Sequence, residues 1–499
     1  MRKSLHLTLL AAILCIFFSG ASAAEQSTFT TLDSGISLFA ASDDEAGLEM
    51  WRSDGTSAGT FRLTDDACND YCEQYNSFFA PWIKAGNRAF VLAQEGDMST
   101  LWVTDGSREG TFPVFEGMRI WNLTPPVWVK NLGRLFFVVN RDFGHDYELW
   151  CSDGTPEGTR KVKTFVSADS RGGIRELTAF QGRAFFNGQD ALNGPSLWSS
   201  DGTETGTVLV RSFFRDQEQN DPSWLRVVGA QLLFIAPTPN AGTVLWKSDG
   251  THAGTLPIRI LQAGQNSYAT LTDSRVAGGL LFFSTVQQLW VSNGTADGTR
   301  PLTPLLGTPP ALSQESLFKG RYYFEASTES DGWEIWSTDG TRAGTRMLAD
   351  LCPGDCSGVF PGSLRAVRNR LLFTVHNPAG GGAKLWQSDG TVQGTRMIQT
   401  NRDYQRTGDG PVQVAAGHVL FTASYPPAAP PQLWRTDGTK MGTFPISDFI
   451  GYGASNELIG EIPGALLLRI VNETGLDQLW VSNGTRPGTL LLKTIRAGE

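Results

Sequence analysis

The stretch Met50-Trp51-Arg52-Ser53-Asp54-Gly55-Thr56-Ser57-Ala58-Gly59-Thr60 returns nine more times along the 499-residue chain. Every copy has Leu, Ile or Met, then Trp, a variable residue, Ser or Thr, Asp or Asn, Gly, Thr or Ser, two variable residues, Gly and Thr. Successive motif tryptophans lie 44 to 51 residues apart. Self-similarity at such a period is typical of a solenoid, a propeller or another repeat array. The ten motif tryptophans are Trp51, Trp102, Trp150, Trp198, Trp246, Trp290, Trp336, Trp386, Trp434 and Trp480.

Each repeat divides into four short strand candidates. They are rich in aromatic and β-branched residues and are bounded by Gly, Asn, Asp and Pro, as strands are. No part of the sequence shows a convincing helical period. The strands that we expect in the third and fourth units are Val127–Lys130, Arg134–Asn140, Tyr147–Ser152, Thr159–Phe165, Arg175–Phe180, Arg183–Asn187, Ser196–Ser199 and Thr207–Phe213.

The second strand of each unit carries a run of apolar residues, such as Leu135–Val138, Leu281–Phe283 and Leu371–Phe373. A sheet with one solvent-facing side would alternate apolar and polar residues along this strand. These runs do not alternate, so both faces of the sheet are expected to be buried. A blade that lies between two neighbouring blades meets that requirement.

The repeats predict an all-β fold, a β-propeller built from ten four-stranded repeats of about 48 residues. Repeat sequence fills residues 24–499, and no linker divides it. We expect one closed ring, because closure hides strand edges that an open stack would expose. Two five-bladed rings are the alternative, but they would favour a change of composition near the middle of the chain, and none occurs.

The motif itself predicts a strand, a hairpin turn and a second strand. Its Trp should lie on a buried face, because it offers a large apolar area. The variable residue after the Trp, such as Cys151, is expected on the less buried side of the strand. The Asp side chain should accept hydrogen bonds from backbone N–H groups just ahead, while Gly takes a positive φ. Asn293 and Asn483 replace Asp in two copies and can fill the same role.

Residues 1–23 have the parts of a secretory signal peptide. A basic start precedes an apolar run from Leu7 to Phe18, and small residues precede the expected cleavage after Ala23. The run is too short to span a bilayer, and no later segment predicts a transmembrane helix. Cys15 could indicate a lipoprotein signal, but the residues before it are bulky. We expect a secreted, periplasmic or cell-surface protein.

The charge of the chain argues against nucleic acid as a partner. Without residues 1–23 the chain keeps 39 Lys and Arg against 50 Asp and Glu, which gives a net charge of −11. Nucleic-acid binding depends on basic side chains that neutralise phosphates, and the sequence contains no basic cluster.

The cysteines of the repeat region predict two local disulfides. Cys68 and Cys72 form one C-x3-C pair, and Cys352 and Cys356 form another at the same phase of the repeat. Disulfides are common in exported proteins. The alternative is a zinc site, but zinc would need four ligands and neither pair has histidine neighbours. Cys151 is expected to be an unpaired thiol.

The copies Glu148–Thr155, Leu197–Thr203 and Leu385–Thr391 resemble the repeats of the ELWxxDGT repeat family, which comprises bacterial secreted and surface-associated proteins with a propeller-like repeat. The segment Leu351–Cys356 is similar to sequence found between repeats of that family. The resemblance covers residues 24–499, but it implies no reaction and no catalytic residues. The sequence departs from the family pattern because the leading Glu occurs in only three copies, at Glu49, Glu148 and Glu334.

No residue pattern predicts a catalytic, cofactor or metal site. The motif loops could suggest a ring of Ca²⁺ ligands, but each offers one Asp or Asn, whereas calcium takes six to eight oxygens. The four histidines of the repeat region occur at different repeat phases without a hydrolase motif around them. The acid pairs Asp43-Asp44 and Asp65-Asp66 are interpreted as solvated loop residues. Trp121 and Trp333 are expected in loops, as possible surface binding residues.

Two functions from different classes remain open. The first is an exported, non-catalytic binding scaffold that presents variable loops to an unknown protein or glycan ligand, because function on such folds resides in loops added to the scaffold. The second is a secreted carbohydrate-active hydrolase or lyase with a site at the central channel. Clustered acids, His or Tyr in one blade would favour the enzyme.

Overall fold

The computed structural model describes residues 29–496 with gaps. The expected signal peptide lies outside the described residues. The gaps are 44–46, 66–78, 96–97, 120–123, 141–145, 167–172, 214–220, 239–241, 263–270, 286–287, 307, 313–315, 329, 353–357, 360–362, 377–382, 399–404, 407–412, 416–417, 425–431, 450–454 and 472–476.

The described chain forms ten antiparallel sheets, which follow one another in sequence and are called blades 1 to 10. Blade 1 contains β1 (Phe29–Thr31), β2 (Ser37–Asp43), β3 (Gly47–Ser53) and β4 (Phe61–Arg62). Blade 2 contains β5 (Phe79–Lys84), β6 (Ala89–Glu95), β7 (Met98–Thr104) and β8 (Phe112–Arg119). Blade 3 contains β9 (Val127–Val129), β10 (Arg134–Val139), β11 (Asp146–Ser152) and β12 (Arg160–Val166). Blade 4 contains β13 (Ile174–Phe180), β14 (Arg183–Asp190), β15 (Gly194–Ser200) and β16 (Val208–Ser212). Blade 5 contains β17 (Ser223–Val228), β18 (Gln231–Thr238), β19 (Gly242–Ser248) and β20 (Leu256–Gln262).

The second half of the chain repeats this order. Blade 6 contains β21 (Leu271–Ala277), β22 (Leu280–Thr285), β23 (Leu289–Ser292) and β24 (Arg300–Pro301). Blade 7 contains β25 (Leu317–Phe318), β26 (Arg321–Thr328), β27 (Gly332–Thr338) and β28 (Arg346–Ala349). Blade 8 contains β29 (Arg365–Val367), β30 (Arg370–His376), β31 (Ala383–Ser388) and β32 (Arg396–Met397). Blade 9 contains β33 (Gln405–Arg406), β34 (Gln413–Ala415), β35 (His418–Ser424), β36 (Gln432–Thr436) and β37 (Phe444–Phe449), and blade 10 contains β38 (Ser455–Ile462), β39 (Ala465–Val471), β40 (Asp477–Ser482) and β41 (Thr489–Arg496).

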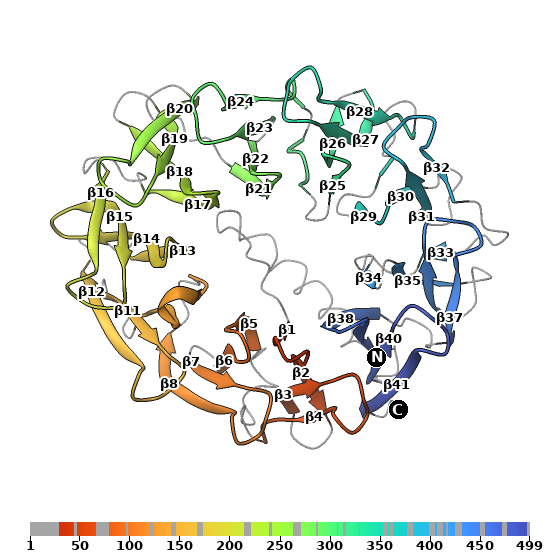
Figure 1. Cartoon of the computed structure of the whole chain (residues 1–499), viewed down its shortest axis with the longest axis horizontal. Coiled ribbons are helices and arrows are strands. Elements are labelled where there is room, and N and C mark those ends of the chain that lie inside the picture. The colour runs from red at the N-terminus through yellow and green to blue at the C-terminus, as the bar shows by residue number, and fades with distance from the viewer. Residues whose placement is uncertain are drawn as a thin grey trace, which may run out of the picture.

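The ten blades stand in one ring, with the first strand of each blade innermost and the last outermost (Figure 1). This arrangement is a ten-bladed β-propeller, so the predicted fold is confirmed and the alternative of two five-bladed rings is wrong. Blade 9 departs from four strands, because β33 and β34 both pair with β35. Among the described residues the one helical element is the 3-10 turn η1 (Lys130–Leu132), and no helix could span a membrane.

The strand predictions for blades 3 and 4 agree with the structure to within three residues at every end. The apolar runs of the second strands pair with the motif strands, so that Phe186 lies opposite Trp198 and Phe234 lies opposite Trp246. The same pairing places an apolar residue of the second strand opposite the motif Trp in every blade. The apolar run and the motif Trp therefore recur together because their residues face each other across adjacent strands.

The hydrophobic core is divided among the interfaces between blades. Ten apolar clusters each combine residues of two adjacent blades. In every case the motif Trp packs in the cluster shared with the preceding blade, as Trp198 does with Phe165 of blade 3 at a ring-centroid distance of 5.1 Å. Both faces of each blade are thus buried, as the non-alternating runs predicted.

The residue after the motif Trp is buried, so its predicted place on the less buried side of the strand is wrong in most blades. Cys151 is 0% exposed, Val103 and Ser199 are each 2% exposed, and Gln387 is 6% exposed. The reason is that this residue points to the opposite face of the strand from Trp, and that face packs on the following blade. Cys151, for example, lies in the cluster between blades 3 and 4.

The ring closes without exchanging a strand between its first and last blades. The interface of blades 10 and 1, here called the seam, is a cluster that includes Phe39 and Trp51 from blade 1 and Ile459 and Leu467 from blade 10. Polar links cross the seam as well, because the Thr31 hydroxyl donates to the Glu461 carbonyl at 2.6 Å. Side-chain packing therefore holds the two ends of the array together.

Replacement of Trp198 by Ala should lower the free energy of unfolding by about 3–5 kcal/mol, because it empties a packed site that is 5% exposed. Chemical denaturation of the wild type and the variant measures the difference. Leu192→Ala, at a side chain that is 74% exposed, is the control and should change stability by less than about 0.5 kcal/mol. A loss below about 1 kcal/mol for Trp198→Ala would contradict the core role of the motif Trp.

Gly460→Ala tests the seam. A Cβ at Gly460 would lie 2.7 Å from Cβ of Ser37 in blade 1, so the substitution should push the two blades apart and destabilise the ring by about 1–3 kcal/mol. The second substitution Ser37→Gly removes the opposing atoms and should restore much of the loss in thermal unfolding. Unchanged melting of Gly460→Ala would show that blades 10 and 1 are not packed this closely.

Candidate functional site

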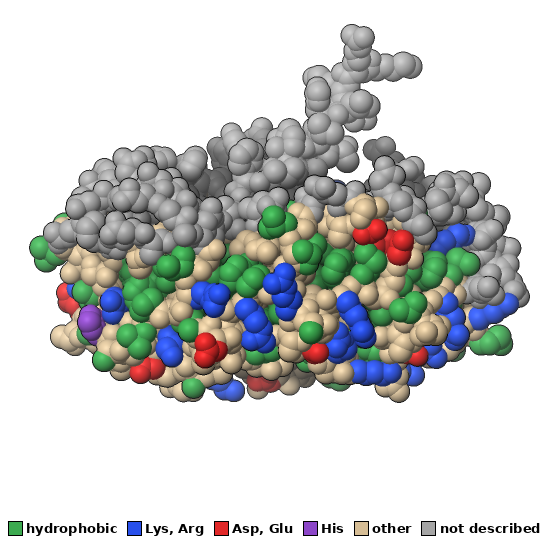
Figure 2. Space-filling view, turned by 90° about the horizontal axis from the view of Figure 1, so that it is seen from above, with side chains coloured by type: hydrophobic (Ala, Val, Ile, Leu, Met, Phe, Trp, Pro, Cys, Tyr) green, Lys and Arg blue, Asp and Glu red, His purple; other side chains and the backbone are tan. Residues whose placement is uncertain are grey.

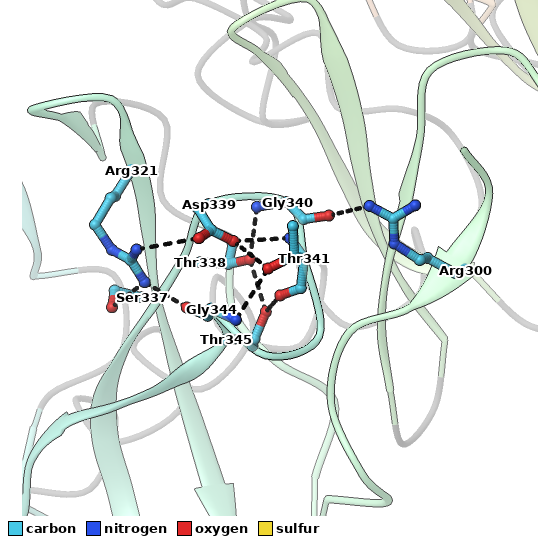
Figure 3. A network of polar contacts seen from close by, with 9 residues as sticks. All are labelled: Arg300, Arg321, Ser337, Thr338, Asp339, Gly340, Thr341, Gly344 and Thr345. Carbon is cyan, nitrogen blue, oxygen red and sulfur yellow. Dashed lines mark hydrogen bonds and ion pairs between the residues drawn. The ribbon is translucent and has the colours of Figure 1, made fainter. Parts of the chain in front are cut away.

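The motif loop is the most frequent polar site of the ring, and blade 7 shows its geometry (Figure 3). One carboxylate oxygen of Asp339 accepts hydrogen bonds from the backbone N–H of Thr341 at 2.9 Å and from its hydroxyl at 2.7 Å. The Thr341 hydroxyl in turn accepts from the backbone N–H of Gly344 at 3.0 Å. A Cβ on Gly344 would lie 2.1 Å from the Asp339 carboxylate, which explains the second Gly of the motif.

A second set of hydrogen bonds joins the two strands at the base of the loop. The hydroxyls of Thr338 and Thr345 lie 2.7 Å apart, and the Thr338 hydroxyl accepts from the backbone N–H of Gly340 at 3.0 Å. The Thr345 hydroxyl also donates to the Thr341 carbonyl at 2.7 Å. Every polar side chain that recurs in the motif therefore forms hydrogen bonds within its own loop.

All ten copies repeat the contact between the Asp or Asn side chain and the Thr or Ser two residues on. Asn293 uses its amide oxygen in the same way, at 3.0 Å to the N–H and 2.7 Å to the hydroxyl of Thr295. The predicted turn role is confirmed. Among the described residues, no group of three or more His, Cys, Asp or Glu is arranged to hold a metal ion.

Basic side chains tie motif loops together. Within blade 7, Arg321 donates to the hydroxyl of Ser337 and to the carbonyl of Gly344, and it lies 3.5 Å from the Asp339 carboxylate. Arg300 of blade 6 reaches across the interface and donates to the carbonyl of Gly340 at 2.7 Å (Figure 3). Three other arginines each donate to the carbonyl of the same motif Gly in the next blade: Arg52 to Gly106, Arg160 to Gly202 and Arg435 to Gly484. The loops thus stabilise neighbouring blades as well as their own.

The polar feature that departs from the repeat lies on the innermost strands of blades 4 to 6, and we call it the inner cluster: Glu176, Trp224, Arg226, Asp273 and Arg275. Glu176, Trp224 and Asp273 occupy equivalent positions, four residues before the end of β13, β17 and β21, where each pairing register shifts at a bulge. Glu176 and Trp224 have φ values of 56° and 60°. Non-glycine residues in this region store strain, which is often found at functional sites.

The acids of the inner cluster bridge neighbouring blades. Glu176 accepts from the backbone N–H of Leu225 in blade 5 at 2.9 Å, and Asp273 accepts from that of Leu312, just ahead of blade 7, at 3.2 Å. Between them, Arg226 of blade 5 donates to the hydroxyl of Ser274 in blade 6 at 2.8 Å. These contacts form a series of links between successive blades on the inner side of the ring.

Burial raises the pKa of both Glu176 and Asp273, although nearby N–H groups and arginines favour their charged forms. Arg275 is the strongest such partner of Asp273, with an N–O distance of 2.9 Å. Arg226 lies over the ring of Trp224 at 5.1 Å. Perturbed acids next to arginines are typical of active sites but also occur in structural ion networks.

Three more acids are fully buried in other strands. Glu325 in β26 accepts from the backbone N–H of Leu364 in blade 8 at 3.2 Å, and Glu49 in β3 accepts from the Thr64 hydroxyl. Glu334 in β27 accepts from the backbone N–H of Leu351 at 3.1 Å, and burial raises the pKa of its carboxyl to about 7. All three are 0% exposed, and each uses its carboxylate within the chain.

The predicted binding residues do not gather in one place. Trp121 lies outside the described residues. Trp333 lies in β27 and is partly buried, so its expected position in a loop is wrong. Of the other tryptophans outside the motif, Trp82 and Trp224 are buried, and the ring of Trp128 packs against that of Phe90 at a centroid distance of 5.8 Å.

The cysteine predictions are tested in part. Cys151 is a free, buried thiol, as expected. Cys352 is buried, and its backbone N–H donates to Glu334 at 3.3 Å. Cys68, Cys72 and Cys356 lie outside the described residues, so both disulfides stay predictions.

The acids and histidines weighed as catalytic candidates do not converge either. Asp43 and Asp65 both pair with Arg62, at 2.7 and 2.6 Å, while Asp44 and Asp66 lie outside the described residues. His252 is exposed at the tip of a motif loop, and His418 is partly buried at the start of β35. The inner cluster was not predicted from the sequence. Its signal in the sequence is that one position of the first strand holds a different kind of residue in successive blades: Glu176, Trp224 and Asp273.

No protein-family model matches the sequence, and no curated protein matches it. Solved structures with a similar fold are β-propeller proteins, and they include peptidases and a glycosidase. The chain is similar to the β-propeller domain of the Trilobed protease from Pyrococcus furiosus, with 13% identity and a TM-score of 0.30 over 75% of this chain and 96% of that chain.

Two further similar structures are enzymes. The GH74 xyloglucanase from Xanthomonas campestris has 13% identity and a TM-score of 0.36, over 95% of this chain and 80% of that chain. Prolyl oligopeptidase B from Galerina marginata has 13% identity and a TM-score of 0.36, and the matched region covers 72% of this chain but only 54% of that chain. At this identity the likeness concerns the fold alone.

Asp249→Asn tests the turn role of the motif acid through its pH dependence. Hydrogen bonds from Thr251 lower the pKa of Asp249 in the folded protein, so its contribution to stability is present above the unfolded pKa of about 4 and is lost as pH falls through the folded pKa. Asn does not titrate. The wild type should therefore melt at or above the variant at pH 7, and this advantage should shrink or reverse near pH 3.

The comparison is made by thermal unfolding from pH 3 to pH 7. Arg342→Gln, at an exposed loop tip, is the control for nonspecific charge effects. A large destabilisation by Asp249→Asn at pH 7 would contradict the turn interpretation, because Asn293 makes the same hydrogen bonds in its own loop.

Proposed function

We propose that the protein is an exported, non-catalytic binding scaffold, with a ligand site on the innermost strands of the ring. The observation that carries this proposal is that four acids already use their carboxylates within the chain. Glu176, Asp273, Glu325 and Glu334 each accept hydrogen bonds from backbone N–H groups of the chain itself. Burial raises the pKa of Glu176, Asp273 and Glu334. The contacts of Glu176, Asp273 and Glu325 link neighbouring blades.

This engagement disfavours the hydrolase alternative. A general acid or base must lie within hydrogen-bond reach of the substrate proton that it transfers. Glu325 and Glu334 are 0% exposed, so a substrate cannot reach them. Both carboxylate oxygens of Asp273 already accept hydrogen bonds, one from Arg275 and Ser274 and the other from Leu312.

The innermost strands nevertheless offer an exposed surface to a ligand. Val227, Val276 and Leu317 occupy equivalent positions in β17, β21 and β25, and their exposed fractions are 37%, 47% and 49%. Arg226 and Arg275 precede two of them. Exposed aliphatic side chains beside arginines favour a protein segment as the ligand, because sugar rings stack mainly on aromatic side chains.

Export belongs to the same proposal. The signal-peptide pattern of residues 1–23 and the two C-x3-C pairs support a secreted, periplasmic or cell-surface location. The likeness of the motif to the ELWxxDGT repeat family supports the same location. A glycan ligand and a carbohydrate-active enzyme are the alternatives that the experiment below addresses.

The test uses the mature chain, residues 24–499, with Asp273→Asn as the variant and Asp297→Asn, at an exposed loop tip of the same blade, as the control. A scaffold should release no products from a panel of polysaccharides. Asp273→Asn should lower the free energy of unfolding by about 1–3 kcal/mol, because the amide nitrogen cannot accept from a backbone N–H. The control should leave stability unchanged.

The opposite result identifies an enzyme. If the wild type degrades a polysaccharide, and Asp273→Asn or Glu176→Gln abolishes the reaction without lowering the melting temperature, the scaffold proposal is wrong. Binding is measured separately on peptide and glycan arrays, with Val276→Asp as the variant. A ligand whose binding is insensitive to Val276→Asp does not use the proposed site on the innermost strands.

A further inference from the structure

The outer wall of the ring carries a charge opposite to that of the whole chain. The chain has 50 acidic and 41 basic residues, yet the only acids in the ten outermost strands are Glu116 and Asp448. Figure 2 shows part of this wall, with basic and apolar side chains gathered in one band and few acids among them. Charge is thus segregated onto the circumference of the ring.

The outermost strands β12, β16 and β20 of blades 3 to 5 contain basic residues but no acid. Their basic residues are Arg160, Lys161, Lys163, Arg211 and Arg259. Five residues of the same strands add large aliphatic side chains to the surface, as described below. We call this region of blades 3 to 5 the outer patch.

Among the described residues, no carboxylate forms an ion pair with Arg160, Lys163, Arg211 or Arg259 of the outer patch. Arg160 donates to the carbonyl of Gly202 at 3.3 Å, and Arg211 donates to the carbonyl of Thr255 at 2.9 Å. These contacts with neutral groups of the following blade hold the guanidinium groups in place but leave a net positive charge. The ion pair that the structure shows within the patch is between Lys161 and Glu148, at 3.0 Å.

The outer patch also exposes aliphatic side chains. The exposed fractions are 49% for Val166, 44% for Val208, 37% for Leu209, 45% for Leu256 and 49% for Ile260. Basic residues on an outermost strand help to prevent pairing with other strands, but that role requires no exposed Leu or Ile. A patch that is both aliphatic and basic on three adjacent blades therefore indicates an interaction surface.

We propose that the outer patch docks the ring on a lipid surface rich in anionic headgroups. The basic residues attract the headgroups, and the aliphatic side chains enter the boundary between headgroups and acyl chains. An anionic polysaccharide would satisfy the charges, but it offers no apolar phase to Leu256 or Ile260. The contacts of Arg160 and Arg211 with the next blade make the three strands one continuous arc.

The test is cosedimentation of the mature chain with two kinds of vesicle, one of phosphatidylcholine and one of phosphatidylcholine with phosphatidylglycerol. The protein should bind only the vesicles with phosphatidylglycerol, and binding should weaken as salt screens the charges. Arg259→Glu should weaken binding at least about fivefold, which corresponds to the loss of one basic residue near such a surface. Ile260→Ser should weaken it severalfold by removing an inserted side chain.

Matched controls come from the motif-loop tips of blades 7 and 8. Arg342→Glu makes the same charge change at an exposed site, and Val392→Ser removes an aliphatic side chain that is 61% exposed. Both controls should bind the vesicles as the wild type does. If either weakens binding as much as its partner in the outer patch, the outer patch is not the docking surface.

Two further outcomes overturn the proposal. One is the absence of binding to vesicles with phosphatidylglycerol, or equal binding to both kinds of vesicle. The other is binding that Arg259→Glu weakens, that Ile260→Ser leaves unchanged and that soluble dextran sulfate abolishes, because this combination identifies a polyanionic polymer as the partner. Neither outcome bears on the ligand site proposed above, which lies on the innermost strands.

Discussion

The packing of each motif Trp on the preceding blade is the contact on which the ring depends. It repeats at every interface, and it recurs at the seam, where Trp51 packs with residues of blade 10. The first Gly of the motif also packs against the preceding blade, because a Cβ at Gly55 would lie 2.2 Å from the Ile462 side chain of blade 10. Each blade therefore stabilises its neighbour through the same residues that form its own turn.

Much of the fold could be predicted from the sequence because the same structural unit occurs ten times with different residues at its variable positions. The motif marks the third and fourth strands, and the apolar runs mark the second, so the strand positions followed directly. The burial of the residue after Trp, such as Cys151, was not predictable from its variability. That position contacts a different residue at each interface, and variation there reflects a changing neighbour rather than solvent.

The candidate site was less accessible to sequence analysis. Glu176 and Asp273 acquire their roles through bulges in the innermost strands and through N–H groups of the next blade, and neither feature has a sequence pattern. Glu334 is the leading Glu of one of the three motif copies that have one, yet its raised pKa depends on burial that the motif does not encode. What distinguished these positions was departure from the repeat, and only the structure shows what the departures contact.

Ring closure without strand exchange has a consequence for how such a protein can change. Every described blade is one continuous piece of chain, and the seam uses the same kind of contact as the other interfaces. A chain permuted to start at another blade could therefore form the same ring, with the old ends joined and a new seam elsewhere. Duplication or loss of a whole repeat would likewise leave intact blades, so evolution can alter the circumference by units of one blade.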